Sequence, residues 1–442
     1  MLLFGENVLW LLVLIGVMIM IHELGHFLAA RFFDVKVEAF SFGFGPRLFG
    51  FRRGETDFRF SLILFGGYVK MAGEQVTDEN VDDPRGFLAK PRWQRLIILF
   101  AGPFMNVVLA IGVLTGLFMV KYQRASDEDL QAVIGHVVVD SPAAKAGIQD
   151  GDRIVRMDGQ NNPNWEDVGL KEVASAYRPM YLTIERNGKR IDMVVTPILS
   201  ERYGVGYAGW DERGEVQLGS VEPGYPAEKA GLLKGDLLLA VNGLPIHSVY
   251  KFQEITKNSG GQPLDIVVQR DGKKIESTVR PVYSKLDGPA RWMIGVTQQQ
   301  KLHLITTRLS FPDSLRESLR QNTKGAMLIG SFLKGVVERR MSPKTITGPI
   351  GIAQLSGEAA REGPSAFFIL MSMVSLNLAI FNLLPIPILD GGMILMLLVE
   401  MVMQRDVSMS VKEAVLKLWF VFILMIVAFV LYNDISRILP PG

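Results

Sequence analysis

The sequence predicts a polytopic α-helical membrane protein with four transmembrane helices, membrane-associated β-hairpins and two small α/β domains. Three observations predict this class. Hydrophobic residues make up 48% of the 442 residues, and the mean hydropathy is +0.23. Four apolar runs are each long enough to cross a bilayer, and one segment of small-domain length occurs twice. The net charge of +2 gives no argument for a nucleic-acid partner, and the absence of cysteine excludes disulfides and thiolate metal ligands.

The four apolar runs approach the ~20 residues that a helix needs to cross ~30 Å of hydrocarbon. They cover residues 8–30, 96–120, 366–384 and 415–431. We assign the transmembrane helices, with their short links, to segments 1–30, 96–120, 366–402 and 403–442. The first run is no typical cleavable signal, because no basic residue precedes Arg31.

The distribution of basic residues predicts the orientation in the membrane. Residues 1–30 contain no Lys or Arg, residues 31–95 contain eleven, and residues 403–414 contain two. Because Lys and Arg near helix ends favour the cytoplasmic side, both of these links should be cytoplasmic. We therefore expect a multi-pass membrane protein, with both termini and residues 121–365 on the outside.

An internal repeat lies in the long segment between the second and third runs. Nineteen residues from Ser141 and nineteen from Tyr225 share eight identities at an offset of 84 residues. Each copy predicts a short helix ended by glycine, then a strand and a tight Asp-Gly or Asn-Gly turn. We expect two domains, at 121–203 and 204–288, which resemble PDZ domains of bacterial proteases. Such domains bind an extended peptide at a sheet edge; the alternative is a pair of steric screens without a ligand.

Two further segments have recognisable patterns. Phenylalanines alternate with other residues over 37–71, a period of two that is typical of strands. Within the cytoplasmic-side loop 31–95 we expect hairpins that lie against the inner leaflet, or else an ordinary cytosolic hairpin with one apolar face. The linker 289–365 contains an amphipathic helix over 311–340, whose apolar core is too short to span the membrane.

The first apolar run contains the motif His22-Glu23-Leu24-Gly25-His26. Residues four apart share a helix face, so His22 and His26 can bind one metal ion. Glu23 is then placed to take a proton from an activated water. Three ionisable groups in one span are costly, and a divalent cation would compensate for them. The alternative is a polar patch lining a helix bundle, as in a transporter or a proton relay.

A third ligand is expected because catalytic zinc usually has three protein ligands. The other three histidines, His136, His247 and His303, all fall in the predicted outside region. Asp390 ends the sequence Phe381-Asn-Leu-Leu-Pro-Ile-Pro-Ile-Leu-Asp, where two prolines interrupt the third apolar run. It lies toward the same inner end of the membrane as His22, which favours Asp390 as the third ligand. The alternative is that Leu-Asp-Gly-Gly only terminates a helix.

These motifs together resemble the site-2 family of intramembrane zinc metalloproteases, in its bacterial type with tandem PDZ domains. The resemblance covers essentially the whole chain, including Ala-Gly-Pro-Phe-Met-Asn in the second span. It implies that His22, His26 and Asp390 bind zinc, that Glu23 is the general base and acid, and that Asn382 helps to hold the substrate backbone.

The resemblance also implies substrates and a biological setting. The substrates would be single-pass membrane proteins, of the trimmed anti-sigma-factor type, and remnant signal peptides. Their cleavage would belong to regulated intramembrane proteolysis in an envelope stress response, and the PDZ pair would exclude substrates with bulky outer domains. Two hypotheses of other classes stand beside this one: a non-catalytic PDZ membrane scaffold and a metal transporter.

Overall fold

The computed structural model of the chain describes residues 2–74, 83–126, 131–200, 204–285, 290–343, 348–387 and 389–438. The chain divides into two compact units. The first, called the helical unit below, comprises Met1–Tyr122, Thr307–Gly330 and Ile346–Pro440. The second, called the repeat unit, comprises Gln123–Thr306, Ser331–Thr345 and the last two residues.

Four helices in the described part of the chain are long and apolar enough to cross a membrane. They are α1 (Leu2–Phe32), α2 (Arg92–Val120), α9 (Pro364–Asn382) and α11 (Met409–Ile438). Each contains or closely matches one of the four predicted runs. Helix α2 packs against both α1 and α9, so these three helices form the centre of the helical unit.

The third predicted span is shorter than the segment 366–402 that we assigned to it. Helix α9 ends at Asn382, and a separate helix α10 (Asp390–Met403) begins eight residues later. Pro385 and Pro387 lie in the intervening segment, where they supply no backbone N–H for a helical hydrogen bond. The Leu-Asp-Gly-Gly sequence therefore begins a helix rather than ending one.

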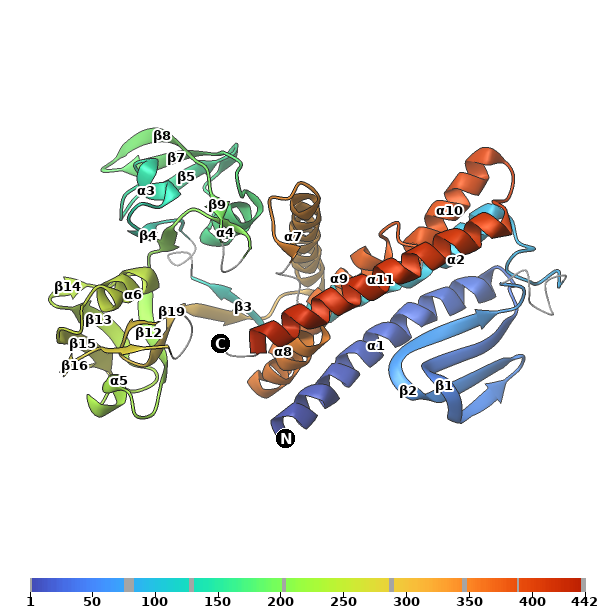
Figure 1. Cartoon of the computed structure of the whole chain (residues 1–442), viewed down its shortest axis with the longest axis horizontal. Coiled ribbons are helices and arrows are strands. Elements are labelled where there is room, and N and C mark those ends of the chain that lie inside the picture. The colour runs from blue at the N-terminus through green and yellow to red at the C-terminus, as the bar shows by residue number, and fades with distance from the viewer. Residues whose placement is uncertain are drawn as a thin grey trace. The chain divides into compact units, whose positions relative to one another are not determined.

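The predicted hairpins form one antiparallel sheet from β1 (Val37–Arg53) and β2 (Thr56–Met71). Residues 37–42 pair with 67–71 on one side and with 57–60 on the other, and 57–60 pair in turn with 49–53. The stretch 67–71 is thus an edge of the sheet, and β2 packs against α1 (Figure 1). Several apolar side chains near the far edge are exposed, among them Leu48, Phe49 and Phe51.

The repeat unit contains two similar lobes, each with its own apolar core. In the first lobe the sheet order is β6-β5-β7-β8, and β4 pairs with β11. Its elements are β4 (Ile134–Val137), α3 (Pro142–Lys145), β5 (Arg153–Met157), β6 (Gln160–Asn161), α4 (Trp165–Ala174), β7 (Met180–Arg186), β8 (Lys189–Val195), β9 (Ile198–Leu199), β10 (Gly206–Tyr207) and β11 (Trp210–Glu212).

The second lobe repeats this plan, with the sheet order β16-β15-β13-β12-β19. Its elements are β12 (Glu215–Val221), α5 (Pro226–Lys229), β13 (Leu237–Val241), β14 (Leu244–Pro245), α6 (Val249–Lys257), β15 (Leu264–Arg270), β16 (Lys273–Val279), β17 (Val282–Ser284), β18 (Arg291–Met293) and β19 (Val296–Lys301). Strands β3 (Tyr122–Ala125) and β20 (Leu304–Thr307) pair where the chain enters and leaves the lobes.

Corresponding residues make the same contacts in the two lobes. Arg186 donates two hydrogen bonds to Asp152, at 2.7 Å each, and Arg270 donates two to Asp236, at 2.6 and 2.7 Å. Both residues of each predicted tight turn have positive φ angles, as a type I′ turn requires. The repeat in the sequence is therefore a repeat in the structure.

The lobe boundaries lie further along the chain than 203 and 288. Ala208 and Trp210 belong to the first core, because β11 pairs with β4. Ile294 belongs to the second core, and β19 pairs with β12 along its length. Each lobe ends with a strand that returns to its first strand, and sequence similarity between the copies does not reveal where that strand lies.

The predicted amphipathic helix is α7 (Phe311–Val337). A second helix in this linker, α8 (Pro349–Glu362), was not predicted from the sequence. It begins after Gly348 with proline at its first position and stops at Gly363 before another proline, which are usual helix boundary signals. Asp434 of α11 accepts hydrogen bonds from the backbone N–H groups of Gly348 and Ile350, at 2.9 and 3.0 Å.

Candidate active site

Two histidines on α1 face the interior of the helical unit. His22 and His26 are one turn apart, so their side chains lie on the same helix face. Their ring centroids are 4.9 Å apart, and the two Nε2 atoms are separated by 3.3 Å. Both residues are buried, with 8% and 7% of their surface exposed. Two imidazoles in an apolar helix thus converge on one point.

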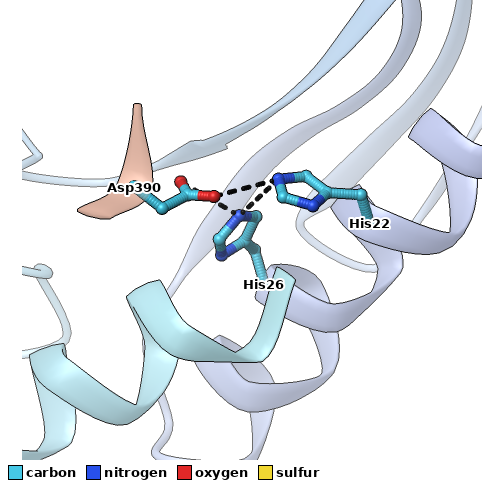
Figure 2. Close-up of side chains that lie close together, drawn as sticks. All are labelled: His22, His26 and Asp390. Carbon is cyan, nitrogen blue, oxygen red and sulfur yellow. Dashed lines mark hydrogen bonds and ion pairs between the residues drawn. The ribbon is translucent and has the colours of Figure 1, made fainter. Parts of the chain in front are cut away.

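Asp390 meets these histidines from the first residue of α10 (Figure 2). Its Oδ2 lies 3.1 Å from His22 Nε2, and its Oδ1 lies 3.5 Å from His26 Nε2. Two glycines explain why the chain can turn here. A Cβ on Gly391 would lie 2.3 Å from the carbonyl oxygen of Leu384, and a Cβ on Gly392 would lie 2.3 Å from that of Ile386.

The three side chains fit a zinc ion. One ligand atom from each can be chosen so that all lie within 4.8 Å of one another. A tetrahedral ion with bonds of ~2.0–2.2 Å keeps its ligand atoms about 3.3 Å apart, close to the separations found here. Asp390 Oδ2 is buried against the His22 imidazole, 3.1 Å from Nε2. A buried carboxylate oxygen of this kind gains by binding a cation.

Helix α2 leaves room for these ligands because Gly102 faces them. A Cβ at this position would lie 2.2 Å from His26 Nε2 and 2.9 Å from the Cε1 atom of His22. A Cβ on Gly25 of α1 would in turn lie 2.2 Å from the carbonyl oxygen of Ala101. The two helices therefore cross closely beside the histidines, with a glycine from each at the crossing.

Glu23 lies between the histidines and the edge of the β sheet. A Cβ built on Gly67 would be 3.2 Å from Glu23 Cγ, and the backbone N–H of Val69 lies close to the Glu23 carboxylate. Residues 67–71 are paired with 37–42 on one side only in the described part of the sheet. The open edge of this strand thus faces Glu23.

Asn382 is the last residue of α9, and its Nδ2 lies 3.5 Å from His22 Nε2. The break that follows α9 therefore brings both Asn382 and Asp390 to the histidines. All five residues that the sequence analysis selected lie at one place, which the structure assembles from α1, α9 and α10.

Three neighbours of the histidines were not selected from the sequence. His26 Nδ1 donates to the carbonyl oxygen of Ile98 at 2.8 Å, and the side-chain Nδ2 of Asn106 lies 3.2 Å from His22 Nδ1. Gly102 is the third. All three are on α2, in or next to the sequence Ala-Gly-Pro-Phe-Met-Asn. A buried asparagine in an apolar span was the available signal.

The fold and this site are those of a membrane-embedded metallopeptidase, and comparison with known sequences agrees. The model of peptidase family M50 matches residues 10–426, so the chain belongs to that family and is a metalloprotease of the site-2 type.

Relatives of known name align over almost the full length. The "Regulator of sigma-E protease RseP" of Salmonella typhimurium is 30% identical over 98% of this chain and 100% of its own. A protein of Treponema pallidum named as a zinc metalloprotease is 30% identical over 96% of this chain and 97% of its own. A Neisseria meningitidis protein of the same description is 28% identical over 96% of this chain and 97% of its own. The predicted resemblance is thereby confirmed.

Among solved structures, the HtrA3 PDZ domain bound to a phage-derived ligand aligns with 21% of this chain and 64% of its own. The identity is 17% and the TM-score 0.14, values that define no fold. The PDZ assignment of the two lobes therefore stays a prediction from the sequence.

Proposed function

We propose that this chain hydrolyses peptide bonds within or near the transmembrane segment of single-pass membrane proteins. The observation that carries the proposal is the convergence of His22, His26 and Asp390, with Glu23 beside them, among helices apolar enough to span a bilayer. Hydrolysis at such a place needs a substrate that is itself in the membrane. The chain would lie in a bacterial inner membrane, with its termini and the repeat unit in the periplasm and the site toward the cytoplasmic side.

The two imidazoles and the Asp390 carboxylate would hold zinc. When bound, zinc would supply Lewis acidity at the scissile carbonyl and lower the pKa of water toward ~7. Glu23 is the only other carboxylate that we assign to the reaction. It takes the proton from the attacking water and passes it to the leaving amine. The backbone N–H of Val69 lies beside that carboxylate and helps to position it.

The open edge of residues 67–71 supports a way of holding the substrate. A transmembrane helix has its carbonyls locked in hydrogen bonds, so the segment to be cut must first unwind. Pairing with this edge would hold the unwound segment as an added strand alongside Glu23. Asn382, 3.5 Å from His22 Nε2, could then satisfy a freed backbone group of the substrate.

The substrate class follows from the family resemblance together with the relatives. A Salmonella relative is named a regulator of sigma-E protease. We propose that this chain cleaves a trimmed anti-sigma factor in an envelope stress response, and remnant signal peptides. The two lobes of the repeat unit would act as PDZ domains that bind a peptide or exclude substrates with bulky outer domains.

Replacement of Glu23 by Gln tests the proposed reaction. In proteoliposomes with a tagged single-pass substrate, Glu23→Gln should lower the rate of cleavage by about 10²–10⁴-fold, because the proton acceptor is lost. Glu6→Gln makes the same change of charge near the start of the same helix and should cleave as the wild type does. Cleavage by Glu23→Gln at the wild-type rate would contradict the mechanism, and zinc flux without cleavage in the wild type would favour a transporter.

A further inference from the structure

The second span makes side-chain and main-chain contacts to both histidines, and one of these contacts has no assigned role. A histidine that binds a metal through Nε2 must carry its proton on Nδ1, and the group that accepts this proton fixes the tautomer. For His26 the acceptor is the Ile98 carbonyl oxygen, at 2.8 Å. A carbonyl can only accept, so Nε2 of His26 presents its lone pair toward Asp390.

For His22 the corresponding neighbour is the side chain of Asn106. Asn106 is completely buried, and its Nδ2 lies 3.2 Å from His22 Nδ1. Its other end, Oδ1, has no hydrogen-bond partner in the described part of the chain. A carboxamide carries a donor at one end and an acceptor at the other. In this orientation it donates to a His22 ring that carries its proton on Nε2, which is the tautomer that cannot bind a metal through Nε2.

A half-turn of the Asn106 carboxamide reverses this arrangement. Oδ1 then stands opposite Nδ1 and accepts its proton, which leaves the Nε2 lone pair of His22 free. The half-turn exchanges the two ends of one planar group, so it needs no movement of α2. Oδ1 also has no hydrogen bond to give up among the described residues. The main chain of Asn106 is held in place by Ser375 of α9, whose Oγ donates to the Asn106 carbonyl oxygen at 2.9 Å.

From this geometry we propose that Asn106 is a positioning residue for the metal site. Its carboxamide lies against His22 Nδ1, and with Oδ1 accepting the Nδ1 proton it holds His22 in the tautomer that presents Nε2. The inference rests on the proposed metal site and adds to it the group that orients His22. An asparagine suits this position because it serves both tautomers, whereas a carboxylate serves only the metal-binding one and a leucine serves neither.

The test compares Asn106→Asp and Asn106→Leu in the purified full-length protein in detergent. Zinc affinity is measured by competition with a chelator, and the coordination geometry by the visible absorption of bound Co²⁺. Loss of a group that orients a ligand typically weakens metal binding by ~10–100-fold. Asn106→Leu should show this loss and an altered Co²⁺ spectrum. Asn106→Asp, which keeps the acceptor, should bind zinc within a few-fold of the wild type.

A matched control separates orientation from packing. Ser372 is also buried between α9 and α2, and its Oγ donates to the Ala110 carbonyl oxygen at 2.9 Å. Ser372→Ala removes that hydrogen bond one turn away from Asn106 and should leave zinc affinity and the Co²⁺ spectrum unchanged. Asn106→Ala provides the same comparison as Asn106→Leu without added bulk.

Two outcomes would overturn the inference. One is wild-type zinc affinity and Co²⁺ absorption in both Asn106→Leu and Asn106→Ala. The other is equal loss in Asn106→Asp and Asn106→Leu, which would mean that Asn106 only packs. Asp390→Ala tests the metal site itself and so separates an error about Asn106 from an error about the site. If Asp390→Ala loses zinc and Asn106→Leu does not, the metal site stands and only the role of Asn106 falls.

Discussion

At the scale of single residues, the repeat unit contains a buried carboxyl, that of Glu172 on α4, whose pKa is far from its ordinary value. This carboxyl accepts hydrogen bonds from the backbone N–H of Ala208, at 2.6 Å, and from Trp210 Nε1, at 2.8 Å. Burial raises the pKa of Glu172 to about 7, and these hydrogen bonds only partly oppose that shift. Glu172 thus joins α4 to the strands that complete the first lobe.

This raised pKa predicts how the stability of the first lobe depends on pH. The folded carboxyl keeps its proton up to about pH 7, whereas the ordinary value is 4.5. Between these values the folded lobe binds more protons than the unfolded one, so its free energy of unfolding falls as pH rises. We expect a fall of about 3 kcal/mol from pH 4.5 to 7.5. Hydrogen exchange at Ala208 in the full chain, corrected for intrinsic rates, measures it.

The matched variants for this experiment are Glu172→Gln and Glu166→Gln. Glu172→Gln has no proton to lose, so its lobe stability should be flat over the same range. Glu166 is exposed at the start of the same helix, so Glu166→Gln should show the same pH dependence of lobe stability as the wild type. Equal pH dependence in Glu172→Gln and the wild type would show that another group is responsible.

Residue patterns predicted the convergence at the site but not the residues that support it. His22, Glu23 and His26 stand out because they are ionisable in an apolar run, and Asp390 because prolines precede it. Gly102 has no such signal, and Asn106 stands out only as one polar residue in an apolar span. The contacts of both residues to the histidines arise only where α2 crosses α1. A glycine or an asparagine in a span has many structural uses, and only the crossing geometry selects one.

At the scale of elements, the crossing of α1 and α2 depends on Gly102. Gly102→Ala would place a methyl group 2.2 Å from His26 Nε2, so the ring or the helix must move. We expect zinc affinity to fall by at least about tenfold, as for a displaced metal ligand. Gly112→Ala on the same helix meets nothing within 4 Å and should bind zinc normally. Competition with a chelator measures the zinc affinity of both variants. Equal zinc affinities in Gly102→Ala and Gly112→Ala would show that a methyl group at position 102 does not displace His26.

Elements were predicted well where their period is strong and poorly where the chain breaks. The four apolar runs and the alternating phenylalanines gave the right element types. The restart of the helix at Asp390 was not predicted, because a proline-rich apolar stretch ending in Asp-Gly-Gly reads equally as a helix end. Likewise, the β1–β2 sheet folds back on itself, so that residues 37–42 pair with two neighbouring stretches of β2. An alternation of period two predicts strands but not which strands pair.

At the scale of the whole molecule, the lobe boundaries show what a repeat can and cannot predict. Matching residues located the Asp158-Gly159 turn in the first copy and the Asn242-Gly243 turn in the second. Strands β11 and β19 lie beyond the matching segments, and each is needed to complete its lobe. The two lobes also touch, since His136 Nε2 lies 2.7 Å from Glu254 Oε2. Such contacts between copies are not encoded in the similarity of the copies.

The proposed orientation can be tested directly because the chain has no cysteine. Val139 in the first lobe and Val402 near the end of α10 are both well exposed, so each can be replaced by a single cysteine. A membrane-impermeant maleimide added to intact spheroplasts should label Val139→Cys rapidly. Val402→Cys should be labelled only after the membrane is opened. The reverse pattern would invert the predicted topology.

We propose that His22, His26 and Asp390 together hold a catalytic zinc ion. The most direct test of this proposal is the zinc content and affinity of the purified wild type, Glu23→Gln and Asp390→Ala. The wild type and Glu23→Gln should each bind one zinc ion per chain, because neither lacks a ligand. Asp390→Ala should bind zinc at least about tenfold more weakly, since one of three protein ligands is gone. Undiminished zinc affinity in Asp390→Ala would remove Asp390 from the site and contradict the account.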